Sequence, residues 1–178
     1  LYLPDGSAVP WSGLTSVSEN SNKKSNEVFY DGVRISNLIS PGDFSGTMKA
    51  ITYPDEFLEF EGVGEARPGV FYGEQPSKTF ALSYRTKVGN DIDEDLGYKI
   101  HILYNVTAIP ATKAYNTYTE DPELVEFEWE IVAIPEEVPG FRPTAHIILD
   151  SRELDSWLLP SIEAYLYGTE TSQPRLLS

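Results

Sequence analysis

The sequence predicts an all-β fold with one C-terminal α-helix, organised as a β-sandwich or β-barrel. Its 178 residues are 40% hydrophobic and include 11 Tyr, 8 Phe and 3 Trp, and aromatic and β-branched side chains favour strands. Polar and apolar residues alternate over several segments, as in strands with one buried face. A helical period occurs only near the C-terminus, and no linker separates two cores. We therefore expect a single domain over residues 1–178.

Two segments, 78–89 and 97–107, alternate most clearly. One face of the first carries Phe80, Leu82, Tyr84 and Val88. One face of the second carries Tyr98, Ile100, Ile102, Tyr104 and Val106. These patterns predict two long strands that pair as a hairpin around the acidic connection 90–96.

Further elements follow from turn residues and local patterns. Asp31-Gly32 predicts a type I′ hairpin over 27–36. Residues 45–54, 56–62 and 142–151 are interpreted as strands, the last with Ala145, Ile147 and Leu149 on one face. Residues 18–24 and 62–73 are interpreted as loops, because they are polar or rich in Gly and Pro.

The C-terminal region predicts the single helix. Leu154, Leu158, Ile162 and Leu166 recur every four residues, Asp155 is a candidate N-cap, and Gly168 is a candidate stop. Pro160 fits badly beyond a first turn, so the helix kinks there or starts later. Residues from about 169 to 178 are expected to form a tail.

A row of like charges stands out in residues 125–135, VEFEWEIVAIP. Val125, Phe127, Trp129 and Ile131 alternate with Glu126, Glu128 and Glu130, so a strand would place three carboxylates on one face. Neighbouring like charges repel, and Glu has little preference for strands. The row therefore needs an explanation beyond strand formation.

Composition excludes several classes of function. The formal net charge is −15, and no run of Lys and Arg offers the basic surface that nucleic-acid binders need. Cysteine is absent, which excludes disulfides, zinc–thiolate sites and thiol catalysis. Apolar runs are far shorter than a membrane helix requires. The chain starts with Leu instead of Met and shows no signal-peptide pattern, which suggests trimming.

No motif predicts catalysis, a cofactor or a metal. Asp91, Asp93 and Asp95 imitate an EF-hand loop, but Leu96 and Ile102 occupy the positions where Gly and Glu are required. His101 and His146 stand alone in predicted strands, which favours structural roles. Glu126 and Glu128 would lie about 7 Å apart on a strand, a separation that is compatible with the two carboxylates of a glycosidase. The same separation occurs in any acidic strand, so it does not by itself indicate an active site. We expect a protein that is not an enzyme.

The chain resembles the major tail protein, or tail tube subunit, of long-tailed bacteriophages that infect actinobacteria. The most specific part is SYRTKVGND (83–91) followed closely by GYKIH (97–101). The motifs that carry the resemblance, in chain order, are AVPWSGLTSV (8–17), FYDGVRI (29–35), TYPDEF (52–57), QPSKTFALSYRTKVGND (75–91), GYKIHILYN (97–105), EFEWEI (126–131), PTAHIILDS (143–151) and LYG (166–168).

The resemblance implies a β-sandwich with one helix that forms hexameric rings, which stack into a tube for genomic DNA. It implies a virion protein of the phage tail, assembled in the host cytoplasm, with tape measure and tail terminator proteins as partners. No catalytic residue, cofactor or membrane contact comes with it. It also predicts a short segment upstream of LYLPDG, which this chain lacks.

Two hypotheses about sites follow from the resemblance. Glu126, Glu128 and Glu130 would face the lumen and repel passing DNA, or, alternatively, lie on the outer tube surface. The loop with Asn90, Asp91, Asp93, Glu94 and Asp95 would contact a neighbouring subunit or ring. A rival function is a carbohydrate-binding β-sandwich, motivated by Trp11, Trp157 and the many Tyr residues.

Overall fold

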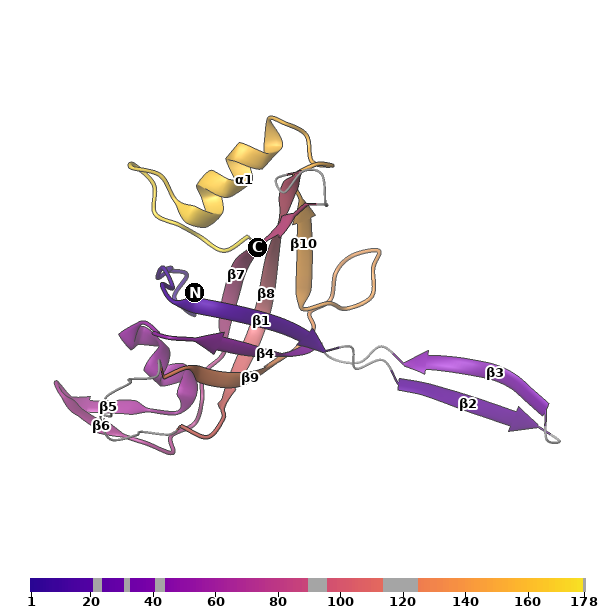
Figure 1. The fold of residues 1–178 in the computed structure, drawn as a ribbon, viewed down its shortest axis with the longest axis horizontal. Coiled ribbons are helices and arrows are strands. Elements are labelled where there is room, and N and C mark those ends of the chain that lie inside the picture. Colours follow the sequence, from indigo (N-terminus) through magenta and orange to yellow (C-terminus); the bar gives the residue numbers. More distant parts are fainter. Residues whose placement is uncertain (21–23, 31–32, 41–43, 90–95, 114–124, 178) are drawn as a thin grey trace.

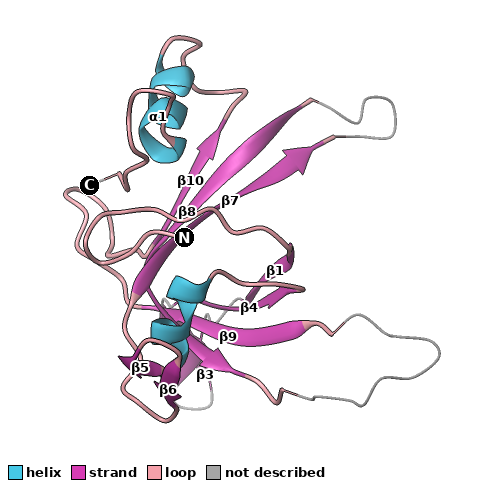
Figure 2. Cartoon of the chain, turned by 90° about the vertical axis from the view of Figure 1, so that its left-hand side faces the viewer, coloured by secondary structure: helices cyan, strands magenta, loops and turns pink. Residues whose placement is uncertain are grey.

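The protein is built on one curled antiparallel sheet (Figures 1 and 2). A computed structural model describes residues 1–20, 24–30, 33–40, 44–89, 96–113 and 125–177. Within these residues the sheet has six strands: five follow the order β1-β4-β9-β8-β10, and the sixth, β7, pairs with β8. The strands are β1 (Leu14–Asn20), β4 (Phe44–Ala50), β7 (Phe80–Val88), β8 (Gly97–Pro110), β9 (Phe127–Ala133) and β10 (His146–Asp150). The predicted all-β fold with a C-terminal helix is confirmed.

Strand β8 is the centre of the sheet, because it is long enough to pair with three others. Its first half lies between β7 and β10, so that His101 is opposite both Tyr84 and Ile148. Its second half pairs with β9, where Ile109 is opposite Glu130. The predicted pairing of the two most regular strands, β7 and β8, is therefore confirmed.

The larger core lies against the inner faces of β4, β8 and β9. Trp129 of β9 is fully buried at its centre, with its ring centroid 5.2 Å from that of Phe57 and 5.8 Å from that of Trp11. Other buried members are Met48, Ala50, Phe60, Phe80, Leu82, Leu103, Val106, Ala108, Ile131 and Ala133. Inward positions of neighbouring strands thus share one apolar cluster, as the alternation predicted.

A second apolar cluster covers the opposite face of β8. Ile100 and Ile102 are fully buried there, and Leu166 of the helix α1 (Leu158–Tyr167) packs against the same group. The Tyr2 hydroxyl donates a buried hydrogen bond of 2.7 Å to the carbonyl oxygen of Leu166. Leu176 and Leu177 also pack here, so the predicted tail folds back over the sheet.

Asn105 explains why Val106 and Ala108 face the larger core. Its φ of 48° lies in the left-handed region, which Asn tolerates better than most residues. The pairing with β7 shifts at the same place, since Leu82 is opposite Leu103 but Phe80 is opposite Val106. This extra residue reverses the alternation. The prediction that Val106 shares a face with Ile100 is therefore wrong.

The segment predicted as a strand at 56–62 is instead a 3-10 helix, η1 (Asp55–Glu61). Phe57 and Phe60 are its buried residues along with Glu61, and a spacing of three suits a turn of three residues better than a strand. Gly62 ends the element with a φ of 81°.

Two hairpins lie outside the main sheet. The predicted Asp31-Gly32 hairpin is confirmed by β2 (Lys24–Tyr30) and β3 (Val33–Ser40), with Tyr30 opposite Val33, although residues 31 and 32 lie outside the described part. Figure 1 shows this hairpin projecting from the main sheet. The region 62–73, predicted as a loop, contains β5 (Gly64–Arg67) and β6 (Val70–Tyr72). The loop predicted at 18–24 is also partly wrong, because β1 continues to Asn20.

The C-terminal helix begins later than its apolar period. It starts at Leu158, so that Pro160 falls in the first turn. Backbone N–H groups of a first turn have no acceptor within the helix, so the N–H that proline lacks costs no hydrogen bond there. Asp155 does not cap it through its side chain. Its main-chain oxygen accepts from the backbone N–H groups of Leu158 and Leu159 instead. Gly168 follows the last turn, as predicted.

A buried ion pair closes one end of the larger core. The Glu61 side chain is 2% exposed, and its Oε2 atom lies 2.7 Å from Lys113 Nζ. The indole N–H of Trp129 also donates to Glu61, and the Lys113 ammonium lies 5.3 Å from the ring centroid of Tyr53. A charge is tolerated in this core because it is both paired and hydrogen-bonded.

We predict that Trp129→Ala lowers the free energy of unfolding by about 3–5 kcal/mol, because it empties the centre of the aromatic core. Trp157→Ala is the matched control, since Trp157 is 69% exposed, and should cost less than about 0.5 kcal/mol. Urea unfolding followed by circular dichroism measures both. Equal losses in the two variants would contradict this account of the core.

Candidate functional site

The outward face of β1, β4 and β9 carries the acidic row. Trp129 and Ile131 point into the core, so Glu128 and Glu130 point away from it and are exposed, as is Glu126 just before the strand. The structure thus confirms the predicted alternation for this part of the segment. Val125 departs from it, because it precedes β9 and is 43% exposed.

Lys49 on the neighbouring strand explains why the carboxylates are tolerated. It lies opposite Glu128 in the β4–β9 register, and its Nζ atom is 3.1 Å from Glu128 and 3.7 Å from Glu126. The hydrogen bond and charge of Glu128 raise the pKa of Lys49. Thr15 of β1 adds a hydrogen bond of 2.6 Å to Glu126 Oε1. The sequence signal for this contact is the polar position of Lys49 within TMKAI (47–51).

The composition of this face limits what it can bind. Lys49 is the only basic residue within β1, β4 and β9, and both of its contacts are to the acidic row. Thr15, Ser16, Ser18 and Thr47 supply hydroxyl groups. Such a face hydrates well and offers no free cation to a phosphate group, so it repels a polyanion.

The sheet also has open margins. β1 pairs with β4 on one side, and no strand in the described part of the chain pairs with its other side. Among the described strands, β7 and β10 pair only with β8, although Ala81 of β7 also forms a bridge with Tyr2. Unpaired strand edges present backbone N–H and C=O groups that a second chain can bind. The acidic face is therefore continuous with an edge open to pairing.

The other candidate site residues from the sequence lie outside this acidic face or have other roles in it. Asn90, Asp91, Asp93, Glu94 and Asp95 lie outside the described residues. Trp11 is half-buried in the core, and its indole N–H donates a hydrogen bond of 2.8 Å to the Thr52 carbonyl oxygen. It therefore offers no free ring for a sugar to stack on, whereas Trp157 is exposed. Glu126 and Glu128, considered as a hydrolytic pair, are both engaged with Lys49.

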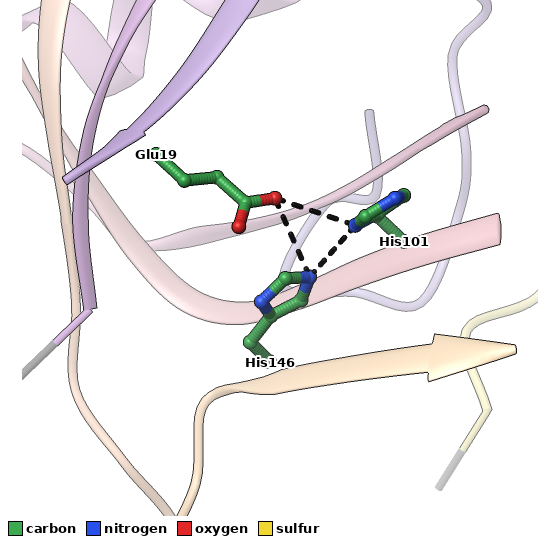
Figure 3. Close-up of side chains that lie close together, drawn as sticks. All are labelled: Glu19, His101 and His146. Atoms are coloured by element: carbon green, nitrogen blue, oxygen red, sulfur yellow. Dashed lines mark hydrogen bonds and ion pairs between the residues drawn. The ribbon is translucent and has the colours of Figure 1, made fainter. Parts of the chain in front are cut away.

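The expectation that His101 and His146 stand alone is wrong. β8 and β10 are adjacent, and His101 Nδ1 lies 3.0 Å from His146 Nε2. Glu19 at the end of β1 also reaches them, with its Oε1 atom 3.3 Å from His101 and 3.8 Å from His146 (Figure 3). Residues 19, 101 and 146 are too far apart in sequence for a spacing motif, so only the sheet topology brings them together.

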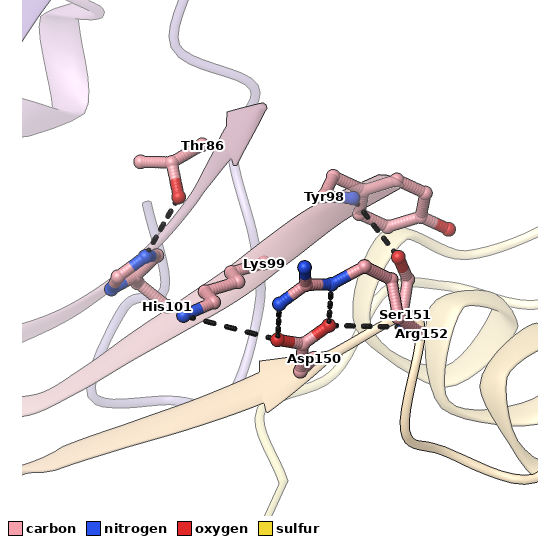
Figure 4. A network of polar contacts seen from close by, with 7 residues as sticks. All are labelled: Thr86, Tyr98, Lys99, His101, Asp150, Ser151 and Arg152. Atoms are coloured by element: carbon pink, nitrogen blue, oxygen red, sulfur yellow. Dashed lines mark hydrogen bonds and ion pairs between the residues drawn. The ribbon is translucent and has the colours of Figure 1, made fainter. Parts of the chain in front are cut away.

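Burial determines the charge state of this cluster. It lowers the pKa of both His101 and His146, while the nearby Glu19 carboxylate acts in the opposite direction. Both imidazoles are therefore expected to be neutral near neutral pH. Lys99 lies two residues from His101 on the same strand and has its own carboxylate, with its Nζ atom 3.8 Å from Asp150 Oδ2 (Figure 4).

Comparison with known proteins gives no relatives by sequence. A scan against protein-family models finds no match, and a search of curated proteins finds none either. Among the residues that the structure describes, none of the helices is both long and apolar enough to cross a bilayer. Inferences about function therefore rest on the geometry of the sheet and on its residues.

We predict that Lys49→Glu destabilises the protein, because it places a third carboxylate beside Glu126 and Glu128. The loss should be larger in 0.1 M than in 1 M salt, because the screening length falls from about 10 Å to about 3 Å. The charge-swapped double variant Lys49→Glu/Glu128→Lys is the control and should recover most of the stability. Urea midpoints at the two salt concentrations test this, and a loss independent of salt would refute it.

Proposed function

We propose that the protein is a structural subunit of a bacteriophage tail tube, which assembles into hexameric rings that stack around a channel for DNA. The observation that carries the proposal is the acidic, hydroxyl-rich face of β1, β4 and β9, which ends at an open sheet edge. The sequence resemblance described above supplies the class of assembly. The all-β fold with one C-terminal helix is compatible with it.

Ring closure follows from the open edges. A neighbouring copy that pairs with the free side of β1 would extend the sheet, and repetition around a ring would produce a closed barrel with no exposed edge. The β2–β3 hairpin pairs with no other described strand, and its projection suits it to reach an adjacent subunit (Figure 1). These features favour assembly over a solitary sheet.

Electrostatics favours a conduit over a nucleic-acid binder. Six copies with a formal net charge of −15 each carry −90 per ring. Proteins that grip DNA through 6 to 10 Lys or Arg contacts bind with an affinity that falls steeply with salt. Such contacts repeated along a tube would hold the genome in place. Glu126, Glu128 and Glu130 facing the lumen would instead keep DNA free to move.

The proposal includes partners and a location that belong to such an assembly. These are other copies of this chain, a tape measure protein, a tail terminator and DNA that passes without specific binding, all within the phage tail of a virion. The protein acts without catalysis in this role. The rival carbohydrate-binding function loses one of the residues that motivated it, because Trp11 packs against the core.

The first test is assembly of the purified chain. We predict that negative-stain electron microscopy of concentrated protein reveals rings or hollow tubes. A glycan array serves as the comparison and should give no hits. Monomers at every concentration, seen both by microscopy and by analytical ultracentrifugation, would overturn the proposal.

The second test locates the acidic row in the tube. The chain has no cysteine, so Glu128→Cys introduces a single thiol. We predict that assembled tubes protect this thiol from a large PEG-maleimide but leave it reactive to a small maleimide, which diffuses along the lumen. Dissociated subunits are the control and should react with both reagents. Equal PEG labelling in tubes and subunits would place the row on the outer surface.

A further inference from the structure

Glu19, His101 and His146 form a compact set of donor atoms contributed by three strands. The glutamate comes from the end of β1, and the two histidines come from the paired strands β8 and β10. His101 and His146 side chains are 10% and 13% exposed, whereas Glu19 is 41% exposed. The cluster therefore has two mostly buried imidazoles and one half-exposed carboxylate, and Figure 3 shows how the three side chains point toward one another.

The distances match those of a tetrahedral metal centre. Ligand atoms about 2.0–2.1 Å from Zn²⁺, at tetrahedral angles, lie about 3.3 Å from one another. The three separations here are 3.0 Å between the imidazole nitrogens and 3.3 and 3.8 Å from these nitrogens to the Glu19 oxygen. These three separations lie on either side of the value of about 3.3 Å expected for tetrahedral Zn²⁺. Two imidazoles with one carboxylate suit Zn²⁺, whereas Ca²⁺ and Mg²⁺ prefer oxygen ligands.

Neighbouring side chains orient the donors. His101 Nε2 lies 2.9 Å from Thr86 Oγ1 (Figure 4). If Nε2 carries the proton and donates it, the lone pair is left on Nδ1, which faces the cluster. The Tyr84 ring stacks on His101 with centroids 4.7 Å apart, and its hydroxyl donates a hydrogen bond of 2.6 Å to Glu19 Oε1. Such supporting contacts are typical of histidine and carboxylate ligands in metal sites.

We propose that Glu19, His101 and His146 bind one Zn²⁺ ion, with solvent at the fourth position. The ligand atoms are Glu19 Oε1, His101 Nδ1 and His146 Nε2, and His146 binds as the tautomer protonated on Nδ1. Because Glu19 belongs to the edge strand β1 and His146 to β10, the ion joins two margins of the curled sheet. This inference is independent of the tube proposal, since it needs only the fold of a single chain.

The test uses the intact chain, freed of metal by a chelator and titrated with Zn²⁺. The sequence contains only two histidines, so the imidazole ¹⁵N spectrum reports the cluster without interference. We predict one Zn²⁺ per chain, and a saturable shift of the His101 Nδ1 and His146 Nε2 signals. A large excess of Ca²⁺ should leave these signals in place.

Matched variants separate the site from other carboxylates. Glu19→Gln should weaken Zn²⁺ binding at least ~10-fold, because it removes a charged ligand, and Thr86→Val should weaken it by ~10–100-fold through loss of the orienting contact. Glu126→Gln, on the acidic face, should leave the affinity unchanged. Imidazole signals that stay unshifted, or equal losses in Glu19→Gln and Glu126→Gln, would overturn the proposal. The cluster would then be a hydrogen-bonded network only.

Discussion

The fold depends on burying both faces of one long strand, β8. Its first half lies between β7 and β10, and its second half pairs with β9, so three neighbours satisfy its backbone. One face contributes Leu103 and Val106 to the larger core, and the other contributes Ile100 and Ile102 to the cluster under α1. The left-handed backbone of Asn105 places Val106 on the same face as Leu103, because one extra residue reverses which face the following side chains occupy.

That arrangement leaves β1, β4 and β9 with one face in the core and one in solvent. The exposed face concentrates carboxylates, and Lys49 offsets part of their repulsion through cross-strand contacts. A surface of this kind is poor at binding polyanions. In the proposed tube, the same charges would act at every level of the wall, so electrostatic repulsion from DNA would not depend on the position of the genome.

The histidine cluster lies where the margins of the curled sheet approach each other. Tyr84 contacts both His101 and Glu19, so the geometry of β7 is coupled to that of β1. A metal ion bound there would connect β1 to the paired strands β8 and β10, which are not its neighbours in the sheet. In a chain without cysteine, imidazole and carboxylate side chains are the ligands available for such a link. Its position near the end of β1 would also fix the edge that the proposed ring uses for pairing.

Four features could be predicted from the sequence: the fold class, the pairing of β7 with β8, the Asp31-Gly32 hairpin and the outward direction of Glu128 and Glu130. These features follow from local alternation and turn chemistry, which depend on residues close together in the chain. Tertiary structure decided the rest. Three features depend on which strands become neighbours: the reversal at Asn105, the contact of Lys49 with Glu128, and the meeting of Glu19 with both histidines. That choice is made by the packing of the whole core, and no local pattern encodes it.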